Sequence, residues 1–249
     1  MTRSPCFGIP FDDGRPEEIL EKAIGLIGLD RAAYVVTPNP EIVMASWKDP
    51  ALQEAILAAD LILPDGVGLM WASRILGTPL RRRLPGIDFA SAMLAELAGR
   101  QGSVFLFGAE PGVARLAGEK LAGRFPGLRI AGTQHGYLSS DEEKTLLEAI
   151  RRSRADLLLV CLGSPKQELW MQEHRADLPG VLMIGLGGAL DVFAGRLRRA
   201  PPSWRRLGLE WLWRLLQEPK RFKRVIRLPA FLWAAMKEKG RKKTWKREN

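Results

Sequence analysis

The sequence has 249 residues, of which 46% are hydrophobic and 27% charged, which is enough for one domain with a sizeable core and an appendage. It contains no run of about twenty apolar residues, which argues against a membrane-spanning helix, and its N-terminal stretch lacks the apolar region of a secretory signal. Two cysteines, Cys6 and Cys161, are too few for a disulfide framework, so we expect a protein of the reducing cytoplasm.

The net charge of +10 is concentrated in the last fifth of the chain. Residues 196–249 hold 18 of the 38 Lys and Arg residues but only 4 of the 28 Asp and Glu residues. The first 195 residues therefore hold 20 basic and 24 acidic residues, and they are mildly acidic. Basic residues interleaved with Trp and Leu are typical of surfaces that contact lipid headgroups or nucleic acid. Five of the eight tryptophans lie in this segment: Trp204, Trp211, Trp213, Trp233 and Trp245.

In chain order, six short apolar runs end in turns rich in Gly, Pro or Asn, and segments of helical periodicity follow them. Repeated βα units of this kind predict an α/β protein with a Rossmann-like parallel sheet flanked by helices. In such sheets ligands bind beyond the carboxyl ends of the strands, where every loop discussed below is expected to lie. The apolar runs are residues 32–36, 60–63, 102–108, 128–134, 155–161 and 181–185.

The tail follows a different pattern, because no further strand is expected there. Apolar residues recur at helical spacing over residues 204–218 and again over 220–239, with Pro219 between them. We therefore expect an α/β core, residues 1–195, followed by a helical, membrane-associating appendage, residues 196–249.

Asp65 directly follows one apolar run, in the sequence LPDG. Pro-Asp-Gly is ordinary turn chemistry, so a turn aspartate is one interpretation. A carboxylate at a strand end also faces the ligand cleft of such a fold, where partial desolvation suits a general base. On the residues alone, both interpretations stay open.

Polar side chains follow two other apolar runs. Thr37 and Asn39 follow one of them, where Asn39 is also a good N-cap for the next helix. Lys166 and Gln167 follow another, where Ser164 with Gln167 matches a capping box. Capping is compatible with ligand contact, because a helix N-terminus also binds anions. We expect Lys166 and Gln167 near the same cleft as Asp65.

Glycines form further strand-end loops, and glycine lets backbone N–H groups approach phosphates closely. Near these loops, Tyr137 can stack on a base and Asp191 can accept hydrogen bonds from a ribose or a base, although structural roles are equally open. The run Arg81-Arg82-Arg83 is by default a solvated face. The loop glycines of interest are Gly108, Gly136, Gly187 and Gly188.

Several enzyme classes lack their motifs in this sequence. Residues 185–190 read GLGGAL, which is not GxGxxG, and no phosphate-binding GxxxxGK[ST] occurs, so a nicotinamide-dependent oxidoreductase is a poor alternative. His135 and His174 have no partners at metal-ligand spacing, and no GxSxG elbow is present. We expect neither a metal nor a Ser-His-Asp triad.

Several motifs occur along the chain in this order: TPNPE, LPDG with WASRILG, RLPGID, GAEPG, HGY, SPKQE and GLGGALDVFAG. With these motifs, the sequence resembles the WecG/TagA/CpsF glycosyltransferases over about residues 7–228. This family includes the N-acetylmannosaminyltransferase of wall teichoic acid synthesis. The resemblance implies an inverting, metal-independent transfer from a UDP-sugar, either N-acetylmannosamine or its uronic acid, to a polyprenyl-pyrophosphate-linked sugar. It also implies an enzyme that is bound peripherally to the inner face of the plasma membrane.

Carried over by position, the resemblance implies that Asp65 is the catalytic base and that Arg83 lies near the lipid-linked acceptor. It implies that the glycine loops, with Tyr137 and Asp191, hold UDP. The expected neighbours of the sugar are Thr37, Asn39 and Gln167. The tail arginines expected to close over the donor pyrophosphate are Arg214, Arg221 and Arg224. The last stretch, residues 237–249, has no counterpart in the resemblance.

Elementary chemistry agrees with this interpretation, because inverting transfer needs one base and a metal-free leaving diphosphate needs cationic side chains. The expected partners are a UDP-sugar, the lipid-linked acceptor and an anionic membrane surface, with a homo-oligomer left open. The main alternative is a nucleic-acid-binding protein that uses the basic tail. The hydrophobicity of the tail and the acidity of the core argue against nucleic acid.

Overall fold

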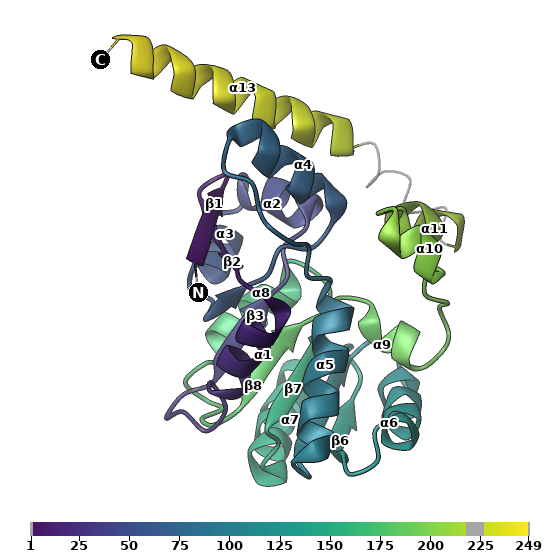
Figure 1. Ribbon diagram of the computed structural model, residues 1–249. Helices are drawn as coiled ribbons and strands as arrows, with labels where there is room; N and C mark the ends of the chain where they lie inside the picture. Colours follow the sequence, from purple (N-terminus) through teal and green to yellow (C-terminus); the bar gives the residue numbers. More distant parts are fainter. Residues whose placement is uncertain (1, 218–226, 249) are drawn as a thin grey trace.

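The computed structural model describes residues 2–217 and 227–248 (Figure 1). Its central element is a six-stranded sheet with the strand order β4–β3–β8–β7–β5–β6, in which every neighbouring pair is parallel. The parallel α/β sheet expected from the six apolar runs is confirmed, with one strand in each run. These strands are β3 (Ala33–Val36), β4 (Leu61–Ile62), β5 (Ser103–Gly108), β6 (Arg129–Gln134), β7 (Leu157–Cys161) and β8 (Leu182–Gly185).

Helices cover both faces of the sheet, and each face has its own hydrophobic cluster. Within β3, Tyr34 and Val36 belong to one cluster and Ala33 and Val35 to the other, because successive strand residues point to opposite faces. One cluster includes α1 (Pro16–Ile24), α5 (Gly86–Gly99), α6 (Val113–Arg124) and α9 (Ala189–Phe193). The other includes α2 (Pro40–Ser46), α3 (Pro50–Leu57), α4 (Val67–Leu76), α7 (Ser140–Ser153) and α8 (Lys166–Glu173).

An N-terminal hairpin that the sequence analysis did not predict precedes the sheet. Its antiparallel strands are β1 (Thr2–Cys6) and β2 (Ile9–Asp13), with Pro5 directly opposite Pro10. Proline normally argues against a strand, since it cannot donate to the ladder. The turn residues Phe7 and Gly8 have φ values of 53° and 78°, and such paired positive φ values match the twist of a tight hairpin.

The hairpin holds the edge strand β4 in place through a buried carboxylate. Asp12 has no exposed surface, and its Oδ2 accepts a hydrogen bond of 2.8 Å from the backbone N–H of Ile62. Its other oxygen is 3.2 Å from Arg3 Nε and 3.4 Å from Lys22 Nζ. A buried charge is tolerated only when it is paired in this way, so the chain just before Asp65 has a fixed position.

The tail begins with two short helices, α10 (Pro202–Arg206) and α11 (Glu210–Gln217). The single helix expected over residues 204–218 is therefore wrong. The break falls at Gly208, whose φ of 73° is left-handed and ends a helical turn.

The last helix, α13 (Arg227–Glu248), confirms residues 227–239 of the second expected helix, and residues 220–226 lie outside the described residues. α13 lies across α4 (Figure 1). Phe231 anchors it, since this side chain is fully buried with its ring 4.9 Å from that of Phe7 and 6.1 Å from that of Trp47. Within the described ranges, no helix is long and apolar enough to cross a bilayer. The domain boundary at residue 195 stays a prediction.

The end of β5 yields a test of packing at the sheet. Gly108 has a φ of 127°, and a Cβ at this position would lie 2.3 Å from the carbonyl oxygen of Cys161 on β7. We expect Gly108→Ala to lower the free energy of unfolding by about 3 kcal/mol, because both backbone strain and overpacking are introduced. Urea denaturation measures this change.

The matched control for this substitution is Gly123→Ala in α6, where an added Cβ meets no atom within 4 Å. Alanine is the better helix former there, so the control is expected to be neutral or slightly stabilising. Equal stabilities of the two variants would contradict the packing argument for Gly108.

Candidate active site

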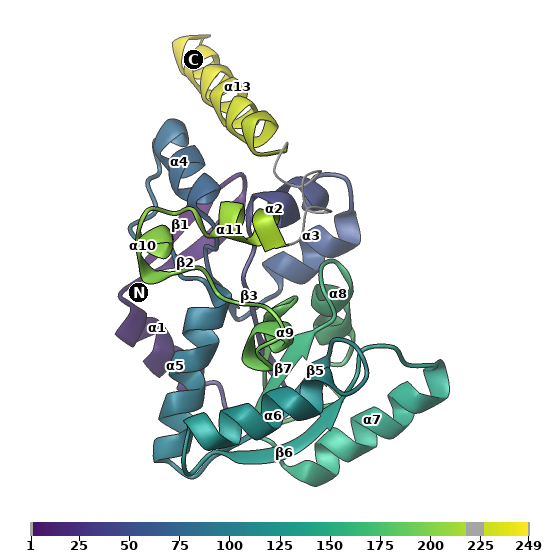
Figure 2. The same ribbon diagram turned by 90° about the vertical axis from the view of Figure 1, so that its right-hand side faces the viewer.

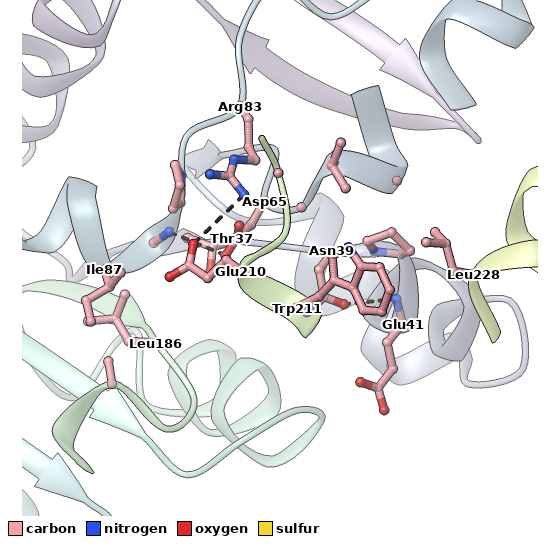
Figure 3. A pocket seen from close by; sticks show the side chains of 18 of the residues that line it. Thr37, Asn39, Glu41, Asp65, Arg83, Ile87, Leu186, Glu210, Trp211 and Leu228 are labelled. Carbon is pink, nitrogen blue, oxygen red and sulfur yellow. Dashed lines mark hydrogen bonds and ion pairs between the residues drawn. The ribbon is translucent and has the colours of Figure 1, made fainter. Parts of the chain in front are cut away.

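A cavity lies at the carboxyl ends of β3, β4 and β8, and the tail helices complete its wall (Figure 3). The loops after the three strands come together there because parallel strands end at the same edge of a sheet. The core contributes Thr37, Asn39, Pro40, Glu41, Asp65, Gly66, Val67, Gly68, Arg83, Pro85, Gly86, Ile87, Leu186 and Ala189. The tail contributes Gly208, Glu210, Trp211, Arg227 and Leu228.

Asp65 lines this cavity in a half-buried position between β4 and α4. Its backbone N–H donates to the carbonyl oxygen of Pro38 over 3.1 Å, which ties the two strand-end loops together. The N-cap of α4 is Gly66, with a φ of 92°, and no side chain caps that helix. The carboxylate of Asp65 therefore does not cap α4, the helix that follows it. Its Oδ2 accepts a long hydrogen bond of 3.5 Å from the N–H of Gly86.

Thr37 and Asn39 line the same cavity, as expected, and both also have structural contacts. Thr37 Oγ1 donates to the carbonyl oxygen of Gly185 over 3.2 Å, which joins the ends of β3 and β8. Asn39 Oδ1 accepts from the N–H groups of Glu41 and Ile42 at 2.9 and 3.1 Å. The capping interpretation of Asn39 is thus confirmed, and it is compatible with a place in the cavity wall.

Two ion pairs connect the cavity wall of the core with that of the tail. Arg83 Nη1 lies 3.9 Å from Glu210 Oε2, and Arg227 Nη1 lies 3.7 Å from Glu41 Oε1. The default interpretation of residues 81–83 as a solvated face does not hold for Arg83, whose side chain is 20% exposed. Glu41 and Glu210 were not predicted as site residues from the sequence, and Trp211 was expected on a surface that meets lipid or nucleic acid rather than in the cavity wall. For the tail, helical periodicity predicted only that one face of each helix would be apolar and packed against another surface.

Gln167 lies behind the cavity rather than in its wall. Its side chain is buried; Oε1 accepts from the N–H of Gly187 at 2.8 Å, and Nε2 donates to Glu168 Oε1 at 2.9 Å. The expected capping box of Ser164 with Gln167 is wrong, because α8 has Pro165 at its N-cap and no side-chain cap. Gln167 instead supports the turn after β8 that carries Leu186 into the cavity wall.

The other expected binding residues lie along the same edge of the sheet but outside the cavity wall. Gly136 donates from its N–H to the carbonyl oxygen of Ala109 over 2.9 Å, next to Gly108. Tyr137 is 69% exposed and Lys166 is also exposed, while Gly187, Gly188 and Asp191 lie at and within the start of α9. Figure 2 shows the ends of β5 and β7 beside α8 and α9. That these loop residues bind the nucleotide of the donor stays a prediction.

Three expected tail arginines are not characterised by the structure. Arg221 and Arg224 lie outside the described residues, and Arg214 lies in α11 without a described side chain. Their role at a pyrophosphate stays a prediction, as does the expectation that the reaction needs no metal.

Glu168, beside Gln167, is a buried acid with a pH-dependent effect on stability. Burial raises its pKa above the ordinary value of 4.5, against the hydrogen bond from Gln167 that lowers the pKa. An acid with a raised folded-state pKa contributes its stability below the unfolded-state pKa and loses it as pH rises through the folded-state pKa. The neighbouring Ser164 side chain acts in the same direction as Gln167 and lowers the pKa of Glu168, but burial has the larger effect.

We therefore expect Glu168→Gln to be more stable than the unchanged protein at pH 8 and to lose this advantage near pH 4. The glutamine cannot ionise, but its amide oxygen can still accept from Gln167. Thermal unfolding at a series of pH values measures the effect. The control is Glu173→Gln at the exposed end of α8, for which the difference between the two pH values should be small. A pH-independent difference for Glu168→Gln would contradict the buried-acid argument.

Comparison with known proteins places these features in context. A model of the glycosyl transferase WecG/TagA/CpsF family matches residues 5–245. A protein of Bacillus spizizenii named N-acetylglucosaminyldiphosphoundecaprenol N-acetyl-beta-D-mannosaminyltransferase is 36% identical over 208 residues, which are 84% of this chain and 80% of that protein. Proteins of the same name from Bacillus subtilis (strain 168) and Staphylococcus aureus (strain MW2) are 36% and 37% identical, over 86% and 83% of this chain and 82% and 80% of theirs.

Proposed function

The chain belongs to the WecG/TagA/CpsF family of glycosyl transferases, and on that premise we propose that it transfers N-acetylmannosamine from a UDP-sugar to a polyprenyl-diphosphate-linked N-acetylglucosamine. The observation that carries the proposal is the position of Asp65. It shares one cavity with Thr37, Asn39 and Arg83 at the carboxyl ends of the strands. The acceptor follows the names of the relatives, which act on N-acetylglucosaminyldiphosphoundecaprenol.

In the proposed reaction, Asp65 removes the proton from the attacking hydroxyl of the acceptor sugar. The hydroxyl oxygen bonds to the anomeric carbon of the donor, the bond from that carbon to the diphosphate breaks, and UDP leaves with the bonding electron pair. The names of the relatives specify a β-linked product, and a β-linked product from an α-linked nucleotide sugar requires inversion. One base suffices for an inverting transfer, so a second acid is not needed.

The charges around the cavity fit substrates that carry diphosphates. Arg83 lines the wall with its side chain 20% exposed, and a guanidinium suits the acceptor diphosphate. The resemblance assigns the donor diphosphate to Arg214, Arg221 and Arg224. Guanidinium groups fixed near a leaving diphosphate stabilise the charge that develops on it.

The outer face of α13 supports a peripheral position at an anionic membrane. Phe231 and Ala235 face the core, whereas Trp233 and Met236 are 62% and 54% exposed. Lys237 Nζ lies 5.5 Å from the centre of the Trp233 ring. Tryptophan prefers the membrane interface and lysine the anionic headgroups, and a lipid-linked acceptor is reached from that interface.

The nucleic-acid alternative has no support from the family or from the named relatives. A screen of UDP-sugars with a short-chain prenyl-diphosphate N-acetylglucosamine acceptor, read by release of UDP, tests the proposed transfer. Release with UDP-N-acetylmannosamine that depends on the acceptor supports it. Release without transfer to the acceptor would contradict it.

Asp65→Asn is the variant that tests the proposed base. We expect it to lower kcat by about a thousandfold or more, because the amide cannot accept the acceptor proton. Acceptor-dependent UDP release measures kcat, and donor binding by calorimetry should stay close to that of the unchanged protein. Asp30→Asn, at an exposed position outside the cavity wall, is the control. Normal turnover by Asp65→Asn would end its assignment as base.

The double substitution Trp233→Ala and Met236→Ala tests the membrane face. We expect about a tenfold weaker partition into vesicles containing phosphatidylglycerol, since two apolar side chains no longer enter the interface. Co-sedimentation measures the partition. Leu57→Ala removes an equally apolar side chain, 42% exposed on α3, and serves as the control. Equal partition of both variants would show that another surface meets the membrane.

A further inference from the structure

Arg83 is held loosely for an arginine with a largely buried side chain. Among the described residues its guanidinium has two polar contacts, a 3.4 Å hydrogen bond to the carbonyl oxygen of Arg205 and the 3.9 Å ion pair with Glu210. Both distances are longer than the roughly 2.7–2.9 Å that is usual for charge-assisted hydrogen bonds. Figure 3 shows the carboxylate of Glu210 directed toward Arg83 within the cavity.

The neighbouring arginine is held much more tightly. Arg199 binds both oxygens of Asp88 at 2.6 Å and lies 3.4 Å from Glu210 Oε1. Asp88 thus fixes Arg199, and Arg199 fixes one oxygen of Glu210. The other oxygen of Glu210 reaches Arg83 at the limit of an ion pair. These ion pairs form a network that joins α5, α11 and the loop before α5. The contact between Glu210 and Arg83 has the longest distance in this network and is therefore its weakest interaction.

We infer that Glu210 occupies the anion position at Arg83 and must give it up when the acceptor diphosphate binds. This inference rests on the proposed function, because that function supplies the diphosphate. The carboxylate is a competitor inside the protein, so it lowers the affinity for the acceptor while the cavity is empty.

A diphosphate is the stronger ligand for a guanidinium with unused donors. It carries more charge than a carboxylate and offers several oxygens for a two-point contact with the planar fork. Glu210 is only 12% exposed, so a carboxylate displaced from Arg83 still needs a partner. Arg199 supplies that partner, because its 3.4 Å contact with the other oxygen of Glu210 does not involve Arg83.

The exchange also selects among ligands. Glu210 repels any anion too weakly charged to replace it, including a single carboxylate, whereas a diphosphate gains more from Arg83 than Glu210 loses. Because Glu210 is the first residue of α11, the exchange releases one of the contacts that hold this tail helix over the cavity. Binding of the acceptor is thereby linked to the position of the tail.

Glu210→Gln tests this inference. The amide keeps an oxygen for Arg199 but no longer competes for Arg83, so we expect the KM for the prenyl-diphosphate N-acetylglucosamine acceptor to fall about two- to fivefold. The KM for the UDP-sugar should stay unchanged. The same assays on the unchanged protein test the proposed function, so an inactive unchanged protein would overturn both statements.

The control is Glu148→Gln, which removes the 3.0 Å ion pair with Arg152 at an exposed site on α7, outside the cavity wall and away from the loops expected to bind substrate. Its acceptor KM should not change. An acceptor KM that rises or stays unchanged in Glu210→Gln, or a donor KM that changes equally, would overturn the inference and leave Glu210 with a purely structural role.

If thermal unfolding shows Glu210→Gln to be misfolded, Glu210→Asp provides the second test. Its shorter carboxylate is withdrawn from Arg83 and should lower the acceptor KM in the same sense.

Discussion

The geometry of the site depends on one buried hydrogen bond, from the backbone N–H of Ile62 to the carboxylate of Asp12. β4 is the edge strand of the sheet and has only two residues, so its pairing with β3 alone gives it little support. The N-terminal hairpin supplies the missing partner through a side chain rather than through another strand. Because Asp65 follows Ile62 by three residues, the hairpin that fixes β4 also fixes the proposed base.

Residues of the cavity wall stabilise the fold and also lie where the proposed function needs them. Asn39 caps α2 with the same side chain that lines the cavity, and Thr37 joins β3 to β8 from within the wall. For Asn39 the sequence left a capping role and a role in ligand binding open, and the structure shows that the capping contact is compatible with a place in the cavity wall. A side chain whose position is fixed by backbone hydrogen bonds is preorganised for a ligand, and this reduces what binding must order.

The predictable parts of the fold are those that depend on local pattern. Six apolar runs became six parallel strands, because fully buried parallel strands need continuous hydrophobic segments. The hairpin was missed since Pro5 and Pro10 hide its strands, and the helical break at Gly208 was missed because a single glycine is also tolerated inside a helix. Asp65, Thr37 and Asn39 were predicted near the cleft from the strand ends that they follow, and Arg83 from the family resemblance, but Glu210 was not predicted. Its contacts cross more than a hundred residues of chain to Arg83, and such a contact leaves no local signal.

The opposite charges of core and tail have a structural explanation in these contacts. Tail arginines pair with core carboxylates at Asp88, Glu110 and Glu41, so the mild acidity of the first 195 residues complements the basic tail. Partly exposed ion pairs of this kind each contribute about 1 kcal/mol or less, whereas complete burial of an aromatic side chain such as Phe231 contributes about 1.5–3 kcal/mol. Apolar contacts therefore fix where α13 lies, while the ion pairs near the cavity are weak enough to exchange. Tail arginines paired in this way can exchange core carboxylates for diphosphates or lipid headgroups while Phe231 keeps α13 on the core, and the proposed transfer to a lipid-linked acceptor makes use of that combination.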